Sequence, residues 1–255
     1  MSDQAVLTES RDGVLIVTLN RPDARNAVNQ AVAQGIADAL DALDADDDLQ
    51  VGVLTGAGKG FSAGMDLRAF VKGERPYVGD RGFAGITQRA ARKPLIAAVE
   101  GFAVAGGFEI VLSCDLVVAS KGTRFGIPEV KRGLIAGAGG LLRIPQRLPY
   151  GIAMELALTG DLMQAERGYE LGLVNKLTEP GEALDGAVEL AATISANAPL
   201  ALAASKEILQ QVGDWTDEEF WTKQGPTVDE IFASEDAKEG ATAFAEKREP
   251  NWQGR

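Results

Sequence analysis

The 255-residue sequence contains no histidine and only one cysteine, Cys114. Without histidine, the Ser-His-Asp and Cys-His forms of nucleophilic catalysis are excluded, and the commonest metal ligand is missing. One cysteine excludes an internal disulfide, and because Cys114 lies among apolar residues we interpret it as a buried thiol. A zinc site would need carboxylates alone, so we expect no metal site. Proton transfer in any reaction is therefore expected to use carboxylates, lysines or tyrosines.

Long apolar runs and an excess of positive charge are also missing. No stretch approaches the roughly 20 apolar residues that a membrane span needs. The first residues, MSDQA, have neither the basic start nor the apolar stretch of a signal peptide. We therefore expect a cytoplasmic protein with no membrane partner. The net charge of −12 argues against nucleic acid as a partner and requires a local basic patch for any anionic ligand.

The sequence does contain an ordinary globular composition, with 45% hydrophobic and 24% charged residues. Short β-branched or apolar runs predict strands at residues 14–20, 51–55, 95–99, 116–119, 124–125 and 173–176. Apolar residues at helical spacing predict helices at residues 28–43, 106–114, 139–148, 150–158, 164–171, 181–197, 199–211, 217–234 and 236–247. Residues 70–85 show no clear period, and we interpret them as a mobile connection. Strands alternating with helices, then helices alone, predict an α/β core followed by a helical C-terminal region.

Two glycine-rich junctions follow predicted strands, FSAGMDL at residues 61–67 and GFAVAGGFE at residues 101–109. Glycine allows positive φ and close approach of a ligand to the backbone. N–H groups at a helix start point outward, so two such junctions side by side would aim two donors at one developing oxyanion. Either loop alone is equally explained as a tight turn for packing. Neither matches the GxGxxG or Walker A spacing of nucleotide-binding loops.

Two glutamates lie close to such loops. Glu109 lies in the first turn of an apolar helix, where the helix dipole favours a carboxylate that would otherwise be costly to bury. Glu129 follows a proline and precedes Lys131 and Arg132. On these grounds alone, Glu109 could be a helix cap and Glu129 a salt-bridged loop carboxylate.

Taken in order, the motifs become specific. RPDARNA at residues 21–27, then the two junctions, then FGIPEVKRGL and GAGG between residues 125 and 140, then LGLVN at residues 171–175, resemble the crotonase (enoyl-CoA hydratase/isomerase) superfamily over nearly the whole chain. The resemblance implies the crotonase fold, an α/β spiral of ββα turns followed by a helical trimerisation region. We expect a core domain at residues 1–195 and the trimerisation region at residues 196–255, assembled as a homotrimer or a dimer of trimers.

The resemblance also implies an enoyl-CoA hydratase, which adds water reversibly to a 2-enoyl-CoA to give a 3-hydroxyacyl-CoA. Met65 and Gly106 stand where the family places its two oxyanion-hole N–H groups. Glu109 and Glu129 stand where hydratases place their catalytic glutamates, Glu109 for the water and Glu129 for the proton at C2. The partner is an acyl-CoA substrate, and no separate cofactor is expected because coenzyme A is part of that substrate.

The resemblance further suggests substrate- and CoA-binding residues. Arg25 is the strongest basic candidate because it lies inside the opening motif, and Arg21 and Lys72 also lie near the expected loops. In relatives, the C-terminal region of a neighbouring subunit contributes to the CoA site. The full set of candidates is Arg25, Ala27, Ala63, Gly64, Asp66, Leu67, Arg68, Phe244 and Lys247.

Three alternatives stay open. The ending, SEDAKEG at residues 234–240 and AFAEKREPNW at residues 243–252, looks like that of crotonobetainyl-CoA (carnitinyl-CoA) hydratases. A trimethylammonium group would be bound by aromatic faces, for which Phe70, Tyr77 and Phe83 are candidates. A 3,2-enoyl-CoA isomerase would need only one base, and a non-catalytic acyl-CoA-binding protein would need none.

Overall fold

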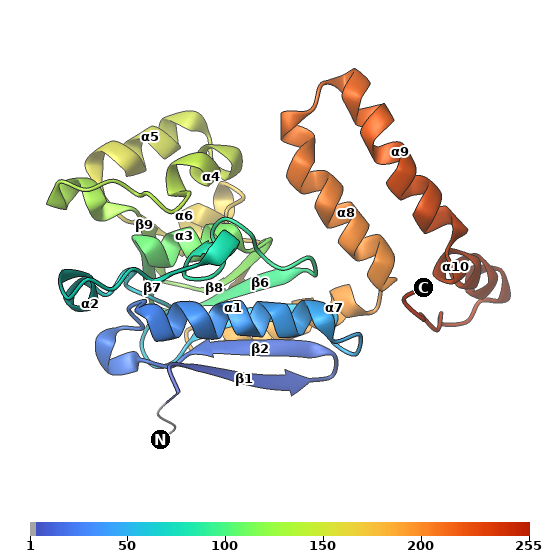
Figure 1. Ribbon diagram of the computed structural model, residues 1–255, viewed down its shortest axis with the longest axis horizontal. Helices are drawn as coiled ribbons and strands as arrows, with labels where there is room; N and C mark the ends of the chain where they lie inside the picture. The colour runs from blue at the N-terminus through green and yellow to red at the C-terminus, as the bar shows by residue number, and fades with distance from the viewer. Residues whose placement is uncertain (1–3) are drawn as a thin grey trace.

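The computed structural model describes residues 4–255, and its centre is a six-stranded sheet (Figure 1). The strands lie in the order β1-β2-β3-β6-β8-β11, in which β1 is antiparallel to β2 and the other neighbours are parallel. Their bounds are β1 Val6–Arg11, β2 Val14–Leu19, β3 Val51–Gly56, β6 Leu95–Val99, β8 Leu116–Ser120 and β11 Lys176–Thr178.

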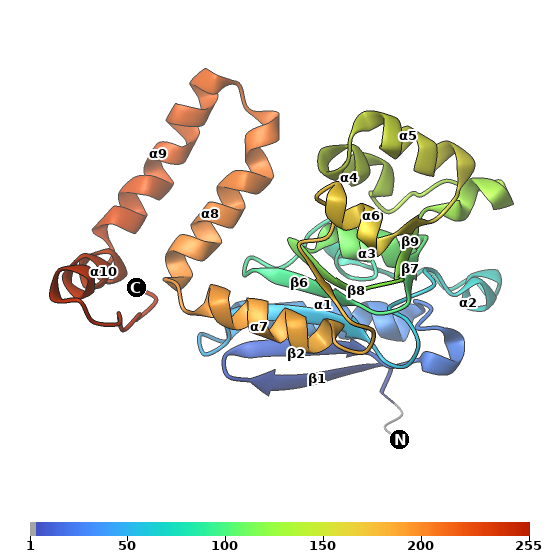
Figure 2. The same cartoon turned by 180° about the vertical axis from the view of Figure 1, so that it is seen from behind.

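Helices cover both faces of this sheet, which is why its central strands are apolar on both sides. In β2, Leu15 and Val17 belong to the core cluster on the face of α1 (Gln30–Ala45), whereas Val14 and Ile16 pack with residues of α7 (Ala183–Ser195). Figure 1 shows α1 in front of the sheet, and Figure 2 shows α7 across the other face.

Smaller elements form a second layer that carries the glycine-rich loops. A three-stranded sheet has the order β10-β9-β7, with β7 at Phe102–Val104, β9 at Arg124–Gly126 and β10 at Met163–Gln164. The helices of this part are α2 Leu67–Val71, α3 Gly106–Ser113, α4 Gly140–Arg147, α5 Tyr150–Thr159 and α6 Ala165–Glu170. Short 3-10 helices are η1 Pro22–Ala24, η2 Gly79–Arg81, η3 Pro128–Arg132 and η4 Val212–Asp214.

The last three helices stand to one side of the sheet (Figures 1 and 2). These C-terminal helices are α8 Pro199–Gln211, α9 Asp217–Ala233 and α10 Glu235–Glu246. Polar contacts connect them to the rest: Lys206 pairs with Asp115 at 2.7 Å, and the Trp252 Nε1–H donates to the Ala196 carbonyl at 2.9 Å. Within residues 4–255, no single helix is long and apolar enough to cross a membrane; α7 and the Pro199–Asp214 segment pass that test only together, bent by 108°.

The expected α/β class, with a helical C-terminal region, is confirmed, with local corrections. The strand predicted at residues 173–176 is wrong in position, because the N–H groups of Leu173 and Val174 both bond to Gly168 and close α6, so that pairing with β8 begins at Lys176. The connection at residues 70–85 is not structureless, since it contains η2 and a small hairpin of β4 (Tyr77–Val78) and β5 (Gly82–Phe83). The sequence patterns missed β1, β7 and α2. The division at residues 195 and 196, just after α7 ends, stays a prediction.

Candidate active site

The loop before α2 presents a free backbone N–H at Met65. Val28 pairs with the two residues on either side of Met65: its N–H donates to the Gly64 carbonyl at 2.8 Å, and its carbonyl accepts from the Asp66 N–H at 2.9 Å. Gly64 has a φ of +87°, which only glycine adopts without strain. Asp66 caps α2 and pairs with Arg21 at 3.0 Å, which fixes the end of the loop and lowers the pKa of the Asp66 carboxyl. Among residues 4–255, no acceptor bonds the Met65 N–H.

A second free N–H belongs to Gly106, the first residue of α3. The preceding Ala105 has φ +53° and ψ −133°, a strained conformation for a residue with a side chain. The Ala105 N–H donates to Gly126 at 2.9 Å, and its carbonyl accepts from the N–H groups of Phe108 and Glu109. The Gly106 N–H has no acceptor in the described part of the chain. A Cβ on Gly64 would lie 2.8 Å from the Gly106 nitrogen, so the two loops that carry the free N–H groups are in contact.

Glu109 is almost completely buried, with 3% of its surface exposed. Its Oε1 accepts hydrogen bonds from the N–H groups of Ala138 at 2.7 Å and Gly140 at 2.9 Å. Burial raises the pKa of Glu109, while these two N–H donors and the charge of Arg143 act in the opposite direction. A Cβ on Gly140 would lie 3.1 Å from Oε1, so glycine leaves the room that this contact needs.

Glu129 lies in η3 and is half-buried. Its Oε2 is buried and has no hydrogen-bond partner within residues 4–255. Burial raises the pKa of Glu129, and the negative charge of Glu109 raises it further. The two carboxyl groups therefore interact electrostatically, and their titrations are coupled. A buried carboxyl oxygen without a donor is costly, and it identifies a group that is kept for a reason other than stability.

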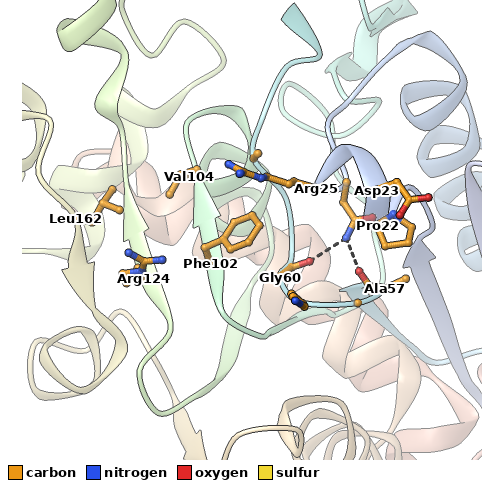
Figure 3. Close-up of a pocket in the computed structure, with 13 residues that line it drawn as sticks. Pro22, Asp23, Arg25, Ala57, Gly60, Phe102, Val104, Arg124 and Leu162 are labelled. Carbon is orange, nitrogen blue, oxygen red and sulfur yellow. Dashed lines mark hydrogen bonds between the residues drawn. The ribbon is translucent and has the colours of Figure 1, made fainter.

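A cavity of about 820 Å³ opens beside the loop that precedes Met65 (Figure 3). Three basic side chains line it, Arg25, Lys59 and Arg124, and none of them forms an ion pair with a described residue. Asn26 connects the loops at its edge, with Nδ2 donating to Ala57 at 2.9 Å and Gly60 at 2.8 Å. The lining residues are Pro22, Asp23, Arg25, Asn26, Ala57, Gly58, Lys59, Gly60, Ala63, Phe102, Val104, Arg124 and Leu162. The cavity is thus a basic site on an acidic protein.

The structure brings together most of the candidates that the sequence predicts. Two of the residues that line the cavity, Arg25 and Ala63, were expected. The other candidates of this region do not line it: Ala27, Gly64 and Asp66 lie in the adjoining loop segments, and Leu67 and Arg68 begin α2. Phe244 and Lys247 end α10, which lies at the opposite end of the molecule from α2 in Figures 1 and 2. Arg21, also considered for the anion, is occupied by Asp66.

Sequence reasoning missed Lys59, Phe102 and Arg124. Lys59 lies within the glycine run from Gly56 to Gly60, and Arg124 opens a strand of three residues. Lys59 could have been identified because it is a lysine within a glycine-rich loop, where a ligand can approach the backbone closely. No local pattern indicates Arg124, because it reaches the cavity only through the pairing of β9 with β7.

The fold and these loops define the enoyl-CoA hydratase/isomerase family, and the chain belongs to it: residues 9–255 match that family. Among its relatives, a carnitinyl-CoA dehydratase from Salmonella arizonae is 42% identical, and the match covers 100% of both chains. The crystal structure of an enoyl-CoA hydratase from Mycobacterium tuberculosis H37Rv matches with a TM-score of 0.97 and 57% identity, over 99% of this chain and 100% of the other. A carnitinyl-CoA hydratase from Mycobacterium avium matches with a TM-score of 0.79 and 45% identity, over 100% of both chains. The expected family and fold, and with them a lyase-type acyl-CoA enzyme, are confirmed.

Proposed function

We propose that this chain catalyses the reversible addition of water to a 2-enoyl-CoA. One observation carries the proposal: buried Glu109 interacts electrostatically with half-buried Glu129 and lies in the first turn of α3, whose Gly106 N–H, like that of Met65, lacks an acceptor in the described chain. An isomerase needs one base, whereas hydration needs one group to take a proton from water and one to supply a proton to carbon.

The environments of the two glutamates assign their roles. Burial raises the pKa of Glu109, but its Oε1 accepts two N–H hydrogen bonds that oppose this effect and hold the carboxylate in place, so Glu109 takes the proton from the attacking water. Glu129 has a donor-free Oε2, and its pKa is raised by burial and by the charge of Glu109, so it holds a proton more readily and delivers it to C2. Dehydration of the 3-hydroxyacyl-CoA uses the same groups in reverse.

The free N–H groups of Met65 and Gly106 form the oxyanion hole. As water adds at C3, negative charge develops on the thioester oxygen, and fixed donors stabilise this charge more than the ground-state carbonyl. Loss of one such donor typically raises the barrier by about 2.7–4 kcal/mol. The contact between the Gly64 and Gly106 loops supports a common target for both donors.

The basic cavity binds the coenzyme A part of the substrate. Arg25, Lys59 and Arg124 are available to its phosphates, and the ring of Phe102 offers an apolar surface. Helix α10, which contains Phe244 and is capped by Lys247, lies at the opposite end of the molecule from α2 (Figure 1). We therefore propose that these two residues complete the site of a neighbouring subunit in a homotrimer or a dimer of trimers. The reaction uses no separate cofactor.

The second candidate is a hydratase for the trimethylammonium acyl group of crotonobetainyl-CoA. Two observations favour it: the 42% identity to the carnitinyl-CoA dehydratase over the full length, and an aromatic pair beside the oxyanion hole. A Cβ on Gly106 would lie 2.7 Å from the Phe83 ring, and Tyr77 contacts Phe83 edge-on at 5.8 Å. Phe70, the third aromatic candidate, is already covered by the Arg75 guanidinium at 4.2 Å.

The test follows the loss of the enoyl-thioester absorbance of crotonyl-CoA with wild type, Glu109→Gln and Glu129→Gln. We expect turnover by wild type and a loss of about 10²–10⁴-fold in each variant, the usual contribution of a general acid or base. Turnover of crotonobetainyl-CoA alone would select the second candidate. Activity that survives Glu109→Gln on a 3-enoyl-CoA would indicate an isomerase, and binding without any turnover would indicate a binding protein.

A further inference from the structure

Arg143 is a mostly buried cation without a carboxylate partner within residues 4–255. It lies on α4, and its side chain leaves the helix toward the segment that follows β5. Its Nη2–H donates to the Thr87 carbonyl at 2.6 Å, and its backbone N–H donates to the Gly139 carbonyl at 3.0 Å. Burying a guanidinium costs free energy unless its surroundings compensate, and one carbonyl oxygen is little compensation.

The Arg143 guanidinium lies directly against Gly139. Gly139 is the residue between Ala138 and Gly140, whose N–H groups donate to Glu109. A Cβ on Gly139 would be 2.1 Å from Nη1 of Arg143, and Gly139 itself has a φ of +100°. The residues on either side, Ala138 and Gly140, donate the two hydrogen bonds to Glu109 Oε1. Arg143 therefore contacts the turn that holds Glu109 and connects it to Thr87 on the other side.

We infer that Arg143 is a positioning residue for Glu109: it fixes the turn formed by Ala138, Gly139 and Gly140, from which two N–H groups donate to the Glu109 carboxylate. The inference rests on the proposed function in one respect, that Glu109 must be ionised to take a proton from water. Two charged or titratable groups are coupled to Glu109: Arg143 from α4 lowers its pKa, and Glu129 from η3 has its own pKa raised by the Glu109 charge. Burial raises the pKa of Glu109, and Arg143 is the cation that opposes this effect.

Arg147 offers a matched control on the same helix. It is also largely buried, and its Nη2–H donates to a backbone carbonyl, that of Cys114. No contact connects it to Ala138, Gly139 or Gly140 in the described chain, and its charge does not act on Glu109. Loss of either arginine removes one cation and one hydrogen bond, but only the loss of Arg143 changes the surroundings of Glu109.

The experiment compares full-length wild type, Arg143→Met, Arg143→Lys and Arg147→Met by two readouts. The first is the pH dependence of kcat for crotonyl-CoA hydration. The second needs no turnover: the carboxyl carbon of isotope-labelled glutamate is titrated by NMR, and the Glu109 signal is identified by its loss in Glu109→Gln. The second readout decides the inference even if wild type fails to hydrate crotonyl-CoA, in which case only the proposed function is lost.

In Arg143→Met we expect Glu109 to titrate at higher pH than in wild type, the acidic limb of kcat to move the same way, and kcat to fall about tenfold with KM nearly unchanged. Arg143→Lys keeps the charge, so the acidic limb of kcat should return to its wild-type position. This variant also tests the inference if Arg143→Met folds poorly. Arg147→Met should leave the titration of Glu109 unchanged. An unshifted Glu109 titration in folded Arg143→Met, or equal shifts in Arg143→Met and Arg147→Met, would overturn the inference.

Discussion

The helices of the core and the C-terminal helices differ in what they bury. Helix α1 has Val32, Ile36, Leu40 and Leu43 inside the core, whereas α8 and α9 have no buried residue at all. The C-terminal helices instead leave large apolar side chains open, Trp221 with 71% and Phe232 with 76% of the surface exposed. A helix without a buried face obtains little stability from helix propensity alone. Packing within one chain therefore explains the stability of the core helices but not that of α8 and α9.

This difference separates two kinds of contribution to the proposed site. Both glutamates and both free N–H groups come from the core, where packing within one chain fixes them. Phe244, with 87% of its surface exposed, belongs to α10, and Lys247 is the residue that caps its C-terminus. If the comparison is correct, changes in the core alter the chemical step, and changes in the C-terminal helices alter assembly and substrate affinity.

Among the changes that test this comparison, Gly106→Ala in the core is expected to have the largest effect. The new Cβ would lie 2.7 Å from the ring of Phe83, which is itself buried, so the ring or the start of α3 must move. The Gly106 N–H would then no longer point toward the thioester oxygen. We expect kcat for crotonyl-CoA to fall about 10²–10³-fold, as for loss of one oxyanion donor. The measurement is steady-state hydration with wild type in parallel.

The matched control for this variant is Gly151→Ala, because Gly151 also lies in the first turn of a helix but has open space where the Cβ would point. It should retain wild-type kcat. Equal kcat in wild type and Gly106→Ala would remove Gly106 from the oxyanion hole.

A smaller effect is expected from Phe232→Ser in α9. If a neighbouring subunit covers this side chain, its loss should weaken association by about 1.5–3 kcal/mol, the cost of leaving a large apolar side chain unburied. Sedimentation velocity over a dilution series should then show smaller species at concentrations where wild type is fully assembled. Glu230→Gln, also exposed on α9, is the control and should assemble normally. Unchanged assembly in Phe232→Ser would place the subunit contact elsewhere.

The same contrast explains what the sequence could predict. The strands of the large sheet and the long helices were predictable because they are buried on both faces or carry a helical period, as Leu95–Val99 and Gln30–Ala45 do. Edge strand β1 was not predicted, because most of its residues are exposed and polar and show no apolar pattern. Strands β4 and β5 of the small hairpin are only two residues long each, too short to show an alternating pattern. Arg81, which lies between them in the chain, is buried, and no sequence pattern predicts burial of a lone arginine.

For the candidate site, the motif order located Glu109, Glu129, Met65 and Gly106, because these residues lie in loops with a recognisable local sequence. Arg143 and Arg124 were not predictable, since each acts across a contact between segments far apart in the chain. The donors to Glu109 come from residues 138 and 140, and their hydrogen bonds depend on the packing of α3 against α4 rather than on a sequence pattern.

Lys247→Asn tests the proposed contribution of α10 to substrate binding. Lys247 has a φ of +56°, and asparagine tolerates this conformation, so the charge is removed without a backbone penalty. We expect KM for crotonyl-CoA to rise about tenfold at unchanged kcat, which corresponds to about 1.4 kcal/mol of binding free energy. Lys238→Ala, an exposed lysine on the same helix, should leave KM unchanged. A rise in KM shared by both variants would indicate a general charge effect instead of a specific contact.

The smallest effect is expected from Asp236→Asn, where the chain end is attached to α10. Asp236 is 2% exposed, and its two carboxylate oxygens accept the N–H groups of Gln253 at 2.6 Å and Gly254 at 3.0 Å. An asparagine retains only one acceptor oxygen, so one buried N–H loses its partner, at a cost of about 1 kcal/mol. Denaturant unfolding should show this loss of stability, with kcat unchanged because the core is untouched. Asp217→Asn, exposed in the first turn of α9, should unfold like wild type. A fall in kcat in Asp236→Asn would mean that the C-terminal helices act on the chemical step, and the separation between the two regions would fail.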